Sequence, residues 1–455
     1  MDSRRRRKKL EKNKNKIKNN EKTQNNAEKA GSTFPVSKRD NEIAALPWVE
    51  VGAYFIFICV MMCIVMQELH RESKAKFFKL KRYNFANGWR IFGTKKDISD
   101  TEWNHFINLL NPVNMLGILG YVLLSHLLQR HLPQFRKVFL LLYSVIGLFI
   151  ILSLPTMLLL AAHIILMFVL AKTRSKYLIW AGVFFQISTL NFTSLMSPIQ
   201  KFFTHEDYYV MVIIVAMTSI RCMSFGLDYC EEHTEAPQKF TLFDYITYVF
   251  YLPTFMTGPL MSYGQFYQQY NLALPYEYGK IVKETLYYFF WCYFLEVALQ
   301  FLYFSAIHNE QSVLWKISPL AVGASALCHL YFFQMKYVVI YGLSRCLALV
   351  DGVNAPKPPN CIMAMYQYRD MWRYFDRGLH HILMKYIYFP FGGSKHGIGR
   401  QILGAFMCFL YVCYWHGFNR NYCYWALFNW CGIVFESVII MVSSLKSFNT
   451  FMGFS

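Results

Sequence analysis

Long apolar runs separated by short polar stretches fill the chain from residue 47 onward. A helix that crosses the hydrocarbon core of a bilayer needs roughly 20 mostly apolar residues. Runs of this kind lie at Pro47–Leu69, Leu109–Leu128, Val138–Ala171, Tyr177–Met196, Tyr208–Phe225, Thr241–Leu260, Ile281–Ile307, Leu314–Leu343, Ile402–Trp415 and Tyr422–Val442. Val138–Ala171 is too long for one helix, and Pro155 near its middle favours a break. The pattern predicts an all-α polytopic membrane protein with ten or eleven spans.

A basic, polar segment precedes the first apolar run. Residues 1–40 hold 14 Lys or Arg against 5 acidic residues, which accounts for +9 of the net charge of +19. We expect residues 1–46 to be a disordered cytosolic tail attracted to anionic lipid headgroups, with nucleic-acid binding as the weaker interpretation. We expect residues 47–455 to form one multi-span domain, anchored by its first run without a cleaved signal peptide.

The stretch Asp351–Lys395 is the most polar one among the spans. On a helix, Trp372, Asp376 and His380 would share a face because they are four residues apart. Charged groups at membrane depth are tolerated where they face protein or water, so an amphipathic or re-entrant helix that lines a cavity fits this stretch. The alternative for Asp376 is an ordinary ion pair with a neighbouring arginine or with His380.

His416 ends the short apolar run Ile402–Trp415 and is followed by polar residues. An ionisable side chain at such a place is costly unless it faces a cavity or a partner, which favours a functional role. The alternative is a histidine that hydrogen-bonds a backbone carbonyl and is favoured by the helix dipole.

Several short motifs in this late region resemble those of one enzyme family. The motifs are Met371-Trp372-Arg373-Tyr374-Phe375-Asp376, Leu379-His380, Phe391-Gly392-Gly393-Ser394, His396-Gly397 and Tyr414-Trp415-His416-Gly417. They are similar to those of the hedgehog acyltransferases in the membrane-bound O-acyltransferase superfamily, which implies a helical core with re-entrant segments. The resemblance implies transfer of palmitate from palmitoyl-CoA to the N-terminal cysteine amine of secreted hedgehog-type signalling proteins. It also implies the endoplasmic-reticulum membrane as the location, with the Golgi as a second compartment.

The same resemblance implies roles for individual residues. His416 matches the catalytic histidine, Asp376 the second essential polar residue and Trp372 a tryptophan that gates the reaction chamber. Cys361 falls where the family has a cysteine that holds haem iron through its thiolate. The family continues with further spans, whereas this chain stops 39 residues after His416, so C-terminal spans are expected to be missing.

Three basic residues near a glycine pair, Lys385, Lys395 and Arg400, are candidates for binding the phosphates of coenzyme A. The alternative is an ordinary solvated loop with the positive charge typical of cytosolic connections. Two other functions stay open. One is a different acyltransferase of the superfamily that acts on a lipid or a peptide hydroxyl, and the other is a non-enzymatic membrane scaffold with the same fold.

Overall fold

The computed structural model describes residues 47–443, except for residues 192–196, 198–199, 234, 237–238 and 273–276. The basic tail predicted for residues 1–46 lies outside this part of the chain. The helices are α2 (Trp48–Lys76), α3 (Thr101–Leu109), α4 (Pro112–His131), α5 (Arg136–Ile151), α6 (Leu154–Lys172), α7 (Lys176–Asn191), α9 (His205–Glu232), α10 (Leu242–Val249), α11 (Leu252–Phe255), α12 (Tyr263–Leu272), α13 (Tyr278–Ala298), α14 (Phe304–His308), α15 (Gln311–Leu314), α16 (Pro319–Val350), α17 (Tyr368–Phe375), α18 (Arg377–Leu383), α19 (Ile398–Trp415) and α20 (Arg420–Ser443). Strands β1 (Phe85–Asn87) and β2 (Lys95–Asp97) pair antiparallel.

Seven of the described helices are long and apolar enough to cross a membrane, namely α2, α4, α6, α9, α16, α19 and α20. The predicted all-α polytopic fold is therefore confirmed. The predicted ten or eleven spans exceed this number, partly because α5 and α7 have 16 residues each, fewer than the roughly 20 that a span needs. The predicted break near Pro155 is present: α5 ends at Ile151, and the proline lies in the first turn of α6.

The prediction of a single span over Thr241–Leu260 is wrong. The segment forms only α10, with eight residues, and α11, with four. Pro253 stands in the first turn of α11, and Gly258 has a φ of +106°, so the helix cannot continue through either position. Most of the segment is buried. It therefore folds back within the protein, as expected of a re-entrant segment that other helices shield from lipid.

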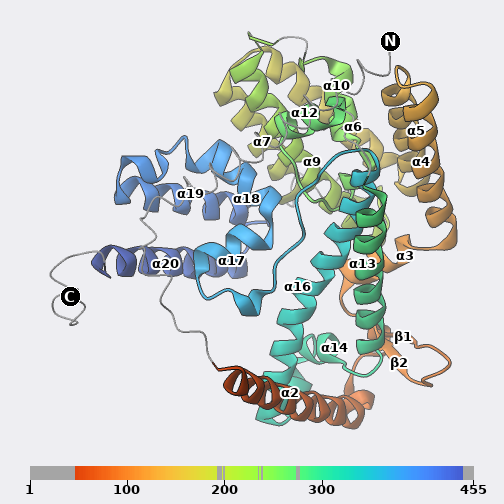
Figure 1. The fold of residues 1–455 in the computed structure, drawn as a ribbon, viewed down its shortest axis with the longest axis vertical. Coiled ribbons are helices and arrows are strands. Elements are labelled where there is room, and N and C mark those ends of the chain that lie inside the picture. Colours follow the sequence, from red (N-terminus) through yellow and green to blue (C-terminus); the bar gives the residue numbers. More distant parts are fainter. Residues whose placement is uncertain are drawn as a thin grey trace.

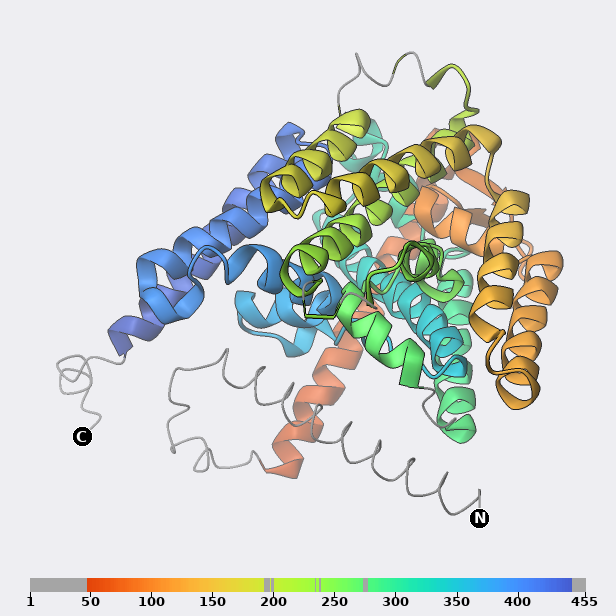
Figure 2. The same cartoon turned by 90° about the horizontal axis from the view of Figure 1, so that it is seen from above.

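The long helix α16 runs through the middle of the molecule (Figure 1). It packs against α13 along its length and against α2 near one end, while α9 packs against α6 and α7. Helices α19 and α20 form a separate hairpin on one side, opposite the α4–α5 pair (Figure 2). The segment that contains α17 and α18 lies between α16 and this hairpin, so the motif residues are held between two sets of long helices.

Candidate active site

Asp376 lies at a break between two short helices. The sequence predicted one helical face for Trp372, Asp376 and His380, but α17 ends at Phe375 and α18 begins at Arg377. Asp376 has extended backbone angles, φ −129° and ψ 90°, and its Oδ1 accepts a hydrogen bond of 2.8 Å from the backbone N–H of Leu379. The aspartate caps α18 instead of continuing α17. The predicted face is therefore wrong for these three residues.

Among the residues that the structure describes, the Asp376 carboxylate has no cation as a close partner. Its Oδ2 accepts a hydrogen bond of 3.0 Å from the hydroxyl of Tyr341, on α16. Nearby Arg373 instead forms an ion pair with Asp370, at 3.3 Å. No ion pair of Asp376 occurs within the described part of the chain, so the ion-pair alternative is not realised. Burial raises the pKa of this carboxyl, because the charged form loses hydration.

A glycine lets α18 approach the segment after α11. A side chain at Gly378 would collide with the backbone carbonyl of Leu260. Gly258, two residues earlier in that segment, lies against Tyr341, where an added Cβ would be 3.4 Å from the ring. The buried segment from Gly258 to Leu260 therefore contacts both Tyr341, which hydrogen-bonds Asp376, and α18, which Asp376 caps.

His416 directly follows the last residue of α19, as the sequence predicted. Its ring stacks on Tyr422 of α20, with centroids 4.9 Å apart and an interplanar angle of 20°, and its faces also meet Trp415 and Trp425 edge-on. His416 as a residue is exposed, and its ring forms no hydrogen bond within the described part of the chain. The alternative of a histidine tied to a backbone carbonyl is therefore not observed. Aromatic rings hold the imidazole in place, and its nitrogens have no hydrogen-bond partner among the described residues.

Trp372 belongs to the same aromatic cluster as His416. Its ring is nearly perpendicular to Trp425, at 5.1 Å between centroids, and Trp425 in turn contacts His416 at 6.4 Å. The indole N–H of Trp372 donates to the side-chain oxygen of Asn429, at 3.1 Å. One ring thus separates Trp372 from His416, and Asp376 terminates the helix that carries Trp372.

Four residues of this site escaped the sequence analysis: Tyr341, Tyr422, Trp425 and Asn429. Trp425 and Asn429 are four residues apart and lie on one face of α20, which is a pattern that could have been found. Tyr341 gives no such signal, because nothing local connects it with Asp376, 35 residues further along the chain.

The candidates for coenzyme A binding have different environments. Lys385 forms an ion pair of 2.6 Å with buried Asp228, which also accepts a hydrogen bond of 2.8 Å from Tyr386. The charge of Lys385 is thus already matched inside the protein. Arg400 is exposed at the start of α19. The side chain of Lys395 lies outside the described residues.

Cys361 has an exposed, free thiol. It lines a small pocket of about 150 Å³ together with Asn360, Met365, Tyr366, Asp370 and Tyr374. Pockets for cofactors usually have roughly 300–1,000 Å³, so these residues do not enclose a haem. No cluster of three or more histidine, cysteine or acidic side chains suited to a metal ion occurs in the part that the structure describes.

Comparison with known proteins places this site in a family. Residues 146–453 match the membrane-bound O-acyltransferase family. The chain is 29% identical to mouse protein-cysteine N-palmitoyltransferase HHAT, over 81% of this chain and 75% of that protein. It is 25% identical to the mouse HHAT-like protein, over 86% and 78% of the two chains, and 23% identical to membrane-bound O-acyltransferase GUP1 of Candida tropicalis, over 88% and 75%. Because the family match spans well over half of its length, the chain belongs to the membrane-bound O-acyltransferase family.

Proposed function

We propose that the protein transfers the palmitoyl group of palmitoyl-CoA to the N-terminal cysteine amine of a secreted, hedgehog-type signalling protein. The observation that carries this proposal is the imidazole of His416, which has no hydrogen-bond partner among the described residues and is held by Tyr422 and Trp425 at the end of an apolar helix. Membership of an acyltransferase family supports acyl-CoA as the donor. The similarity to protein-cysteine N-palmitoyltransferase HHAT supports the choice of acyl group and acceptor.

The residues allow a direct acyl transfer. An α-amine with a pKa of about 8 attacks only as the neutral base, and a histidine can remove its proton as the N–C bond forms. We assign this proton transfer to His416. When the tetrahedral intermediate collapses, the C–S bond breaks and the coenzyme A thiolate leaves, so the proton on His416 can pass to the sulfur. Asp376 and the Tyr341 hydroxyl form a fixed polar pair that can orient and stabilise developing charge nearby.

The aromatic cluster around Trp372 is suited to act as a gate to the reaction chamber. Trp372 packs edge-on against Trp425 and Phe409, so a rotation of its ring would change the space next to His416. We propose that this motion controls access of the acyl chain. The same proposal places the protein in the endoplasmic-reticulum membrane, and also in the Golgi, where a secreted acceptor would meet it.

A second function is favoured by one comparison. The similarity to GUP1 extends over 88% of the chain, and GUP1 is named only as a membrane-bound O-acyltransferase. An acceptor with a lipid or peptide hydroxyl would use the same histidine. The choice of acceptor in an assay separates the two functions.

The test is transfer of alkyne-tagged palmitate from its CoA thioester to a peptide with a free N-terminal cysteine. We expect the purified protein to form a hydroxylamine-resistant amide and the His416→Ala variant to lose about 10²–10⁴-fold in rate. His396→Ala is the matched control, because His396 is also exposed and lies in the same motif region. Transfer to a lysophospholipid but not to the peptide would favour the second function. Equal rates for the two alanine variants would refute the role of His416.

Two further assignments, coenzyme A binding and haem binding, have their own tests. If Lys395 and Arg400 bind coenzyme A phosphates, replacing either by alanine should raise the KM for palmitoyl-CoA, and an unchanged KM would exclude that residue. Lys385→Ala tests the third candidate, with folding measured in parallel because of its pair with Asp228. Haem at Cys361 stays a prediction from the resemblance alone, because the small pocket beside this thiol does not enclose a haem. A haem absorption band in the purified protein that is lost in Cys361→Ala would establish it.

A further inference from the structure

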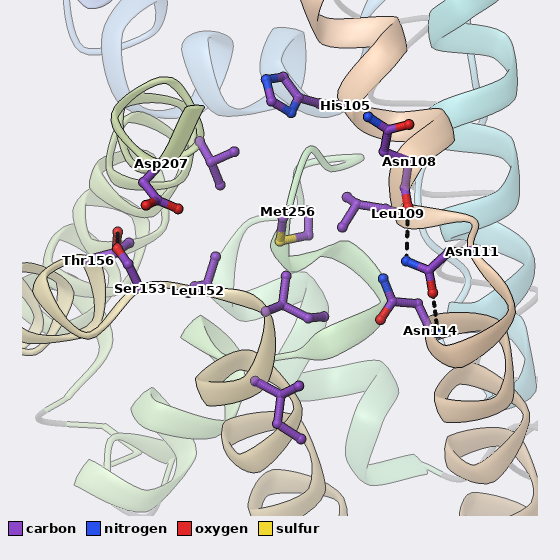
Figure 3. A pocket seen from close by; sticks show the side chains of 13 residues that line it. His105, Asn108, Leu109, Asn111, Asn114, Leu152, Ser153, Thr156, Asp207 and Met256 are labelled. Carbon is purple, nitrogen blue, oxygen red and sulfur yellow. Dashed lines mark hydrogen bonds between the residues drawn. The ribbon is translucent and has the colours of Figure 1, made fainter. Parts of the chain in front are cut away.

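A pocket of about 310 Å³ lies where several helix ends meet (Figure 3). One wall comes from the end of α3 and the turn into α4, a second from the α5–α6 junction, and a third from the beginning of α9. Met256, from the buried segment after α11, lines the pocket between these walls. Its volume is at the lower end of the roughly 300–1,000 Å³ that is usual for ligand sites. We refer to it as the α3–α4 pocket.

One lining residue of the α3–α4 pocket belongs to the segment that contacts the hydrogen-bond partner of Asp376. Met256 is two residues before Gly258, and the turn around Gly258 contacts Tyr341, which hydrogen-bonds Asp376. On another wall, His105 stacks on Tyr209 of α9, with centroids 5.2 Å apart and an interplanar angle of 17°. The segment that carries Met256 therefore connects this pocket with the Asp376 side of the proposed reaction centre.

The lining of the pocket fits a peptide better than a phosphate group. Its right-hand wall in Figure 3 carries three asparagines. The Asn111 side chain donates to the backbone carbonyl of Asn108 and accepts from the backbone N–H of Asn114. The side chains of Asn108 and Asn114 form no hydrogen bonds within the described part of the chain. A primary amide both donates and accepts, as a peptide bond does. Asp207 is the charged residue among the lining residues, which include no lysine or arginine, so an anionic lipid headgroup would be repelled.

The pocket extends from an exposed edge to buried lining residues, which suits the end of a peptide chain. Ile150, at one edge, is 78% exposed, whereas Thr156 is 2% and Leu152 6% exposed. An extended peptide segment in this pocket would hydrogen-bond the asparagines and place an apolar side chain on Leu152 and Met256. Its end would point toward the proposed reaction centre.

We propose that the α3–α4 pocket is the binding site for the N-terminal peptide segment of the protein acceptor. This inference rests on the proposed function, which requires a peptide acceptor. It adds the residues that select the acceptor peptide. Asn108 and Asn114 bind the peptide backbone, while Asp207 favours neutral or cationic segments over acidic ones. These residues act in acceptor binding, and none of them takes part in the chemical step.

The test measures the KM for the cysteine peptide and for palmitoyl-CoA in paired variants. Ile150→Trp narrows the pocket at an exposed position, and Ile146→Trp places the same ring one turn earlier on α5, also at an exposed position but outside the pocket. Asn108→Leu removes a polar contact, and Asn104→Leu is its control on α3. We expect Ile150→Trp and Asn108→Leu each to raise the peptide KM about tenfold and leave the KM for palmitoyl-CoA unchanged. The two controls should match the wild type.

The outcomes separate this inference from the proposed function. Wild-type transfer to the peptide with an unchanged peptide KM in both pocket variants would overturn the pocket alone. A raised KM for palmitoyl-CoA in the pocket variants would also overturn it, because the acyl donor would then use this space. If wild-type protein acylates a lysophospholipid and no peptide, the proposed function fails and the peptide site fails with it.

Discussion

Two aspartates, 25 residues apart, have opposite surroundings. Asp351 is buried and accepts hydrogen bonds from Tyr121, Ser125 and Tyr251, and it forms an ion pair of 3.0 Å with Arg136. Asp376 has one side-chain donor, Tyr341, and no ion pair among the described residues. A buried charge that is fully paired stabilises a particular arrangement of helices, whereas an incompletely paired one is a candidate for chemistry. This difference supports our proposal that Asp351 stabilises the fold and that Asp376 acts in the reaction.

The largest effect on the fold should come from Arg136→Met. This change leaves the Asp351 carboxylate buried without its cation, which typically costs roughly 3–5 kcal/mol. Thermal unfolding in detergent, followed by tryptophan fluorescence, measures the loss. Lys137→Met is the control, because Lys137 pairs with Asp244 at 3.4 Å in a partly exposed position and should contribute less than about 1 kcal/mol. Equal melting temperatures for the two variants would show that Asp351 is not a structural centre.

An intermediate effect, this time on the reaction, is expected from Tyr341→Phe. The ring remains, but Asp376 loses its hydroxyl donor, and a hydrogen bond to a charged group contributes roughly 1.5–3 kcal/mol. We expect kcat to fall about tenfold or more while the peptide KM is unchanged. Because this hydrogen bond lowers the pKa of Asp376, its loss should also move the acidic limb of the pH–rate profile to higher pH. That shift separates positioning of Asp376 from a general structural effect.

Tyr337→Phe is the control for this experiment. Tyr337 lies one turn earlier on α16, and its hydroxyl donates to Glu102 instead, at 3.0 and 3.1 Å. Its removal should leave both kcat and the acidic limb unchanged. An identical loss in the two variants would mean that the hydroxyl on Asp376 has no special part in the reaction.

The smallest effect is expected for Trp372→Phe. An aromatic ring is kept next to Trp425, but the hydrogen bond to Asn429 is lost, which should cost about 1 kcal/mol of stability. Asn429→Leu should cost a similar amount. In the double variant the two losses should not add, because both remove the same hydrogen bond. Additive losses in thermal unfolding would show that the pair is not coupled.

The sequence allowed the helical class and the place of His416 to be predicted, because both depend on local patterns. Hydropathy marks the apolar runs, and the polar residues that follow Trp415 mark the end of α19. Helical periodicity failed at Asp376, where the capping bond to Leu379 replaces a continuous helix. Hydropathy also failed over Thr241–Leu260, because a buried re-entrant segment is as apolar as a true span.

Other features depend on residues that are far apart in the sequence. Lys385 was predicted to bind phosphate, but its partner Asp228 lies 157 residues earlier. Tyr341 and Asp376 come from different helices, and the α3–α4 pocket combines side chains from residues 105 to 256. No periodic pattern within one segment reports such pairs, so only the three-dimensional arrangement reveals them.

The most direct test of the contrast between the two aspartates compares Asp376→Asn with Asp351→Asn. For each variant, the melting temperature and the rate of palmitoyl transfer are measured on the same preparation. The raised pKa of Asp376 means that its ionised form lowers stability once the pH exceeds the carboxyl pKa of the unfolded chain. Asp376→Asn should therefore melt at or above the wild-type temperature at pH 7 and lose transfer. Asp351→Asn should melt several degrees lower, while its folded fraction keeps transfer. Full activity in Asp376→Asn, or a wild-type melting temperature in Asp351→Asn, would contradict the division between reaction and fold.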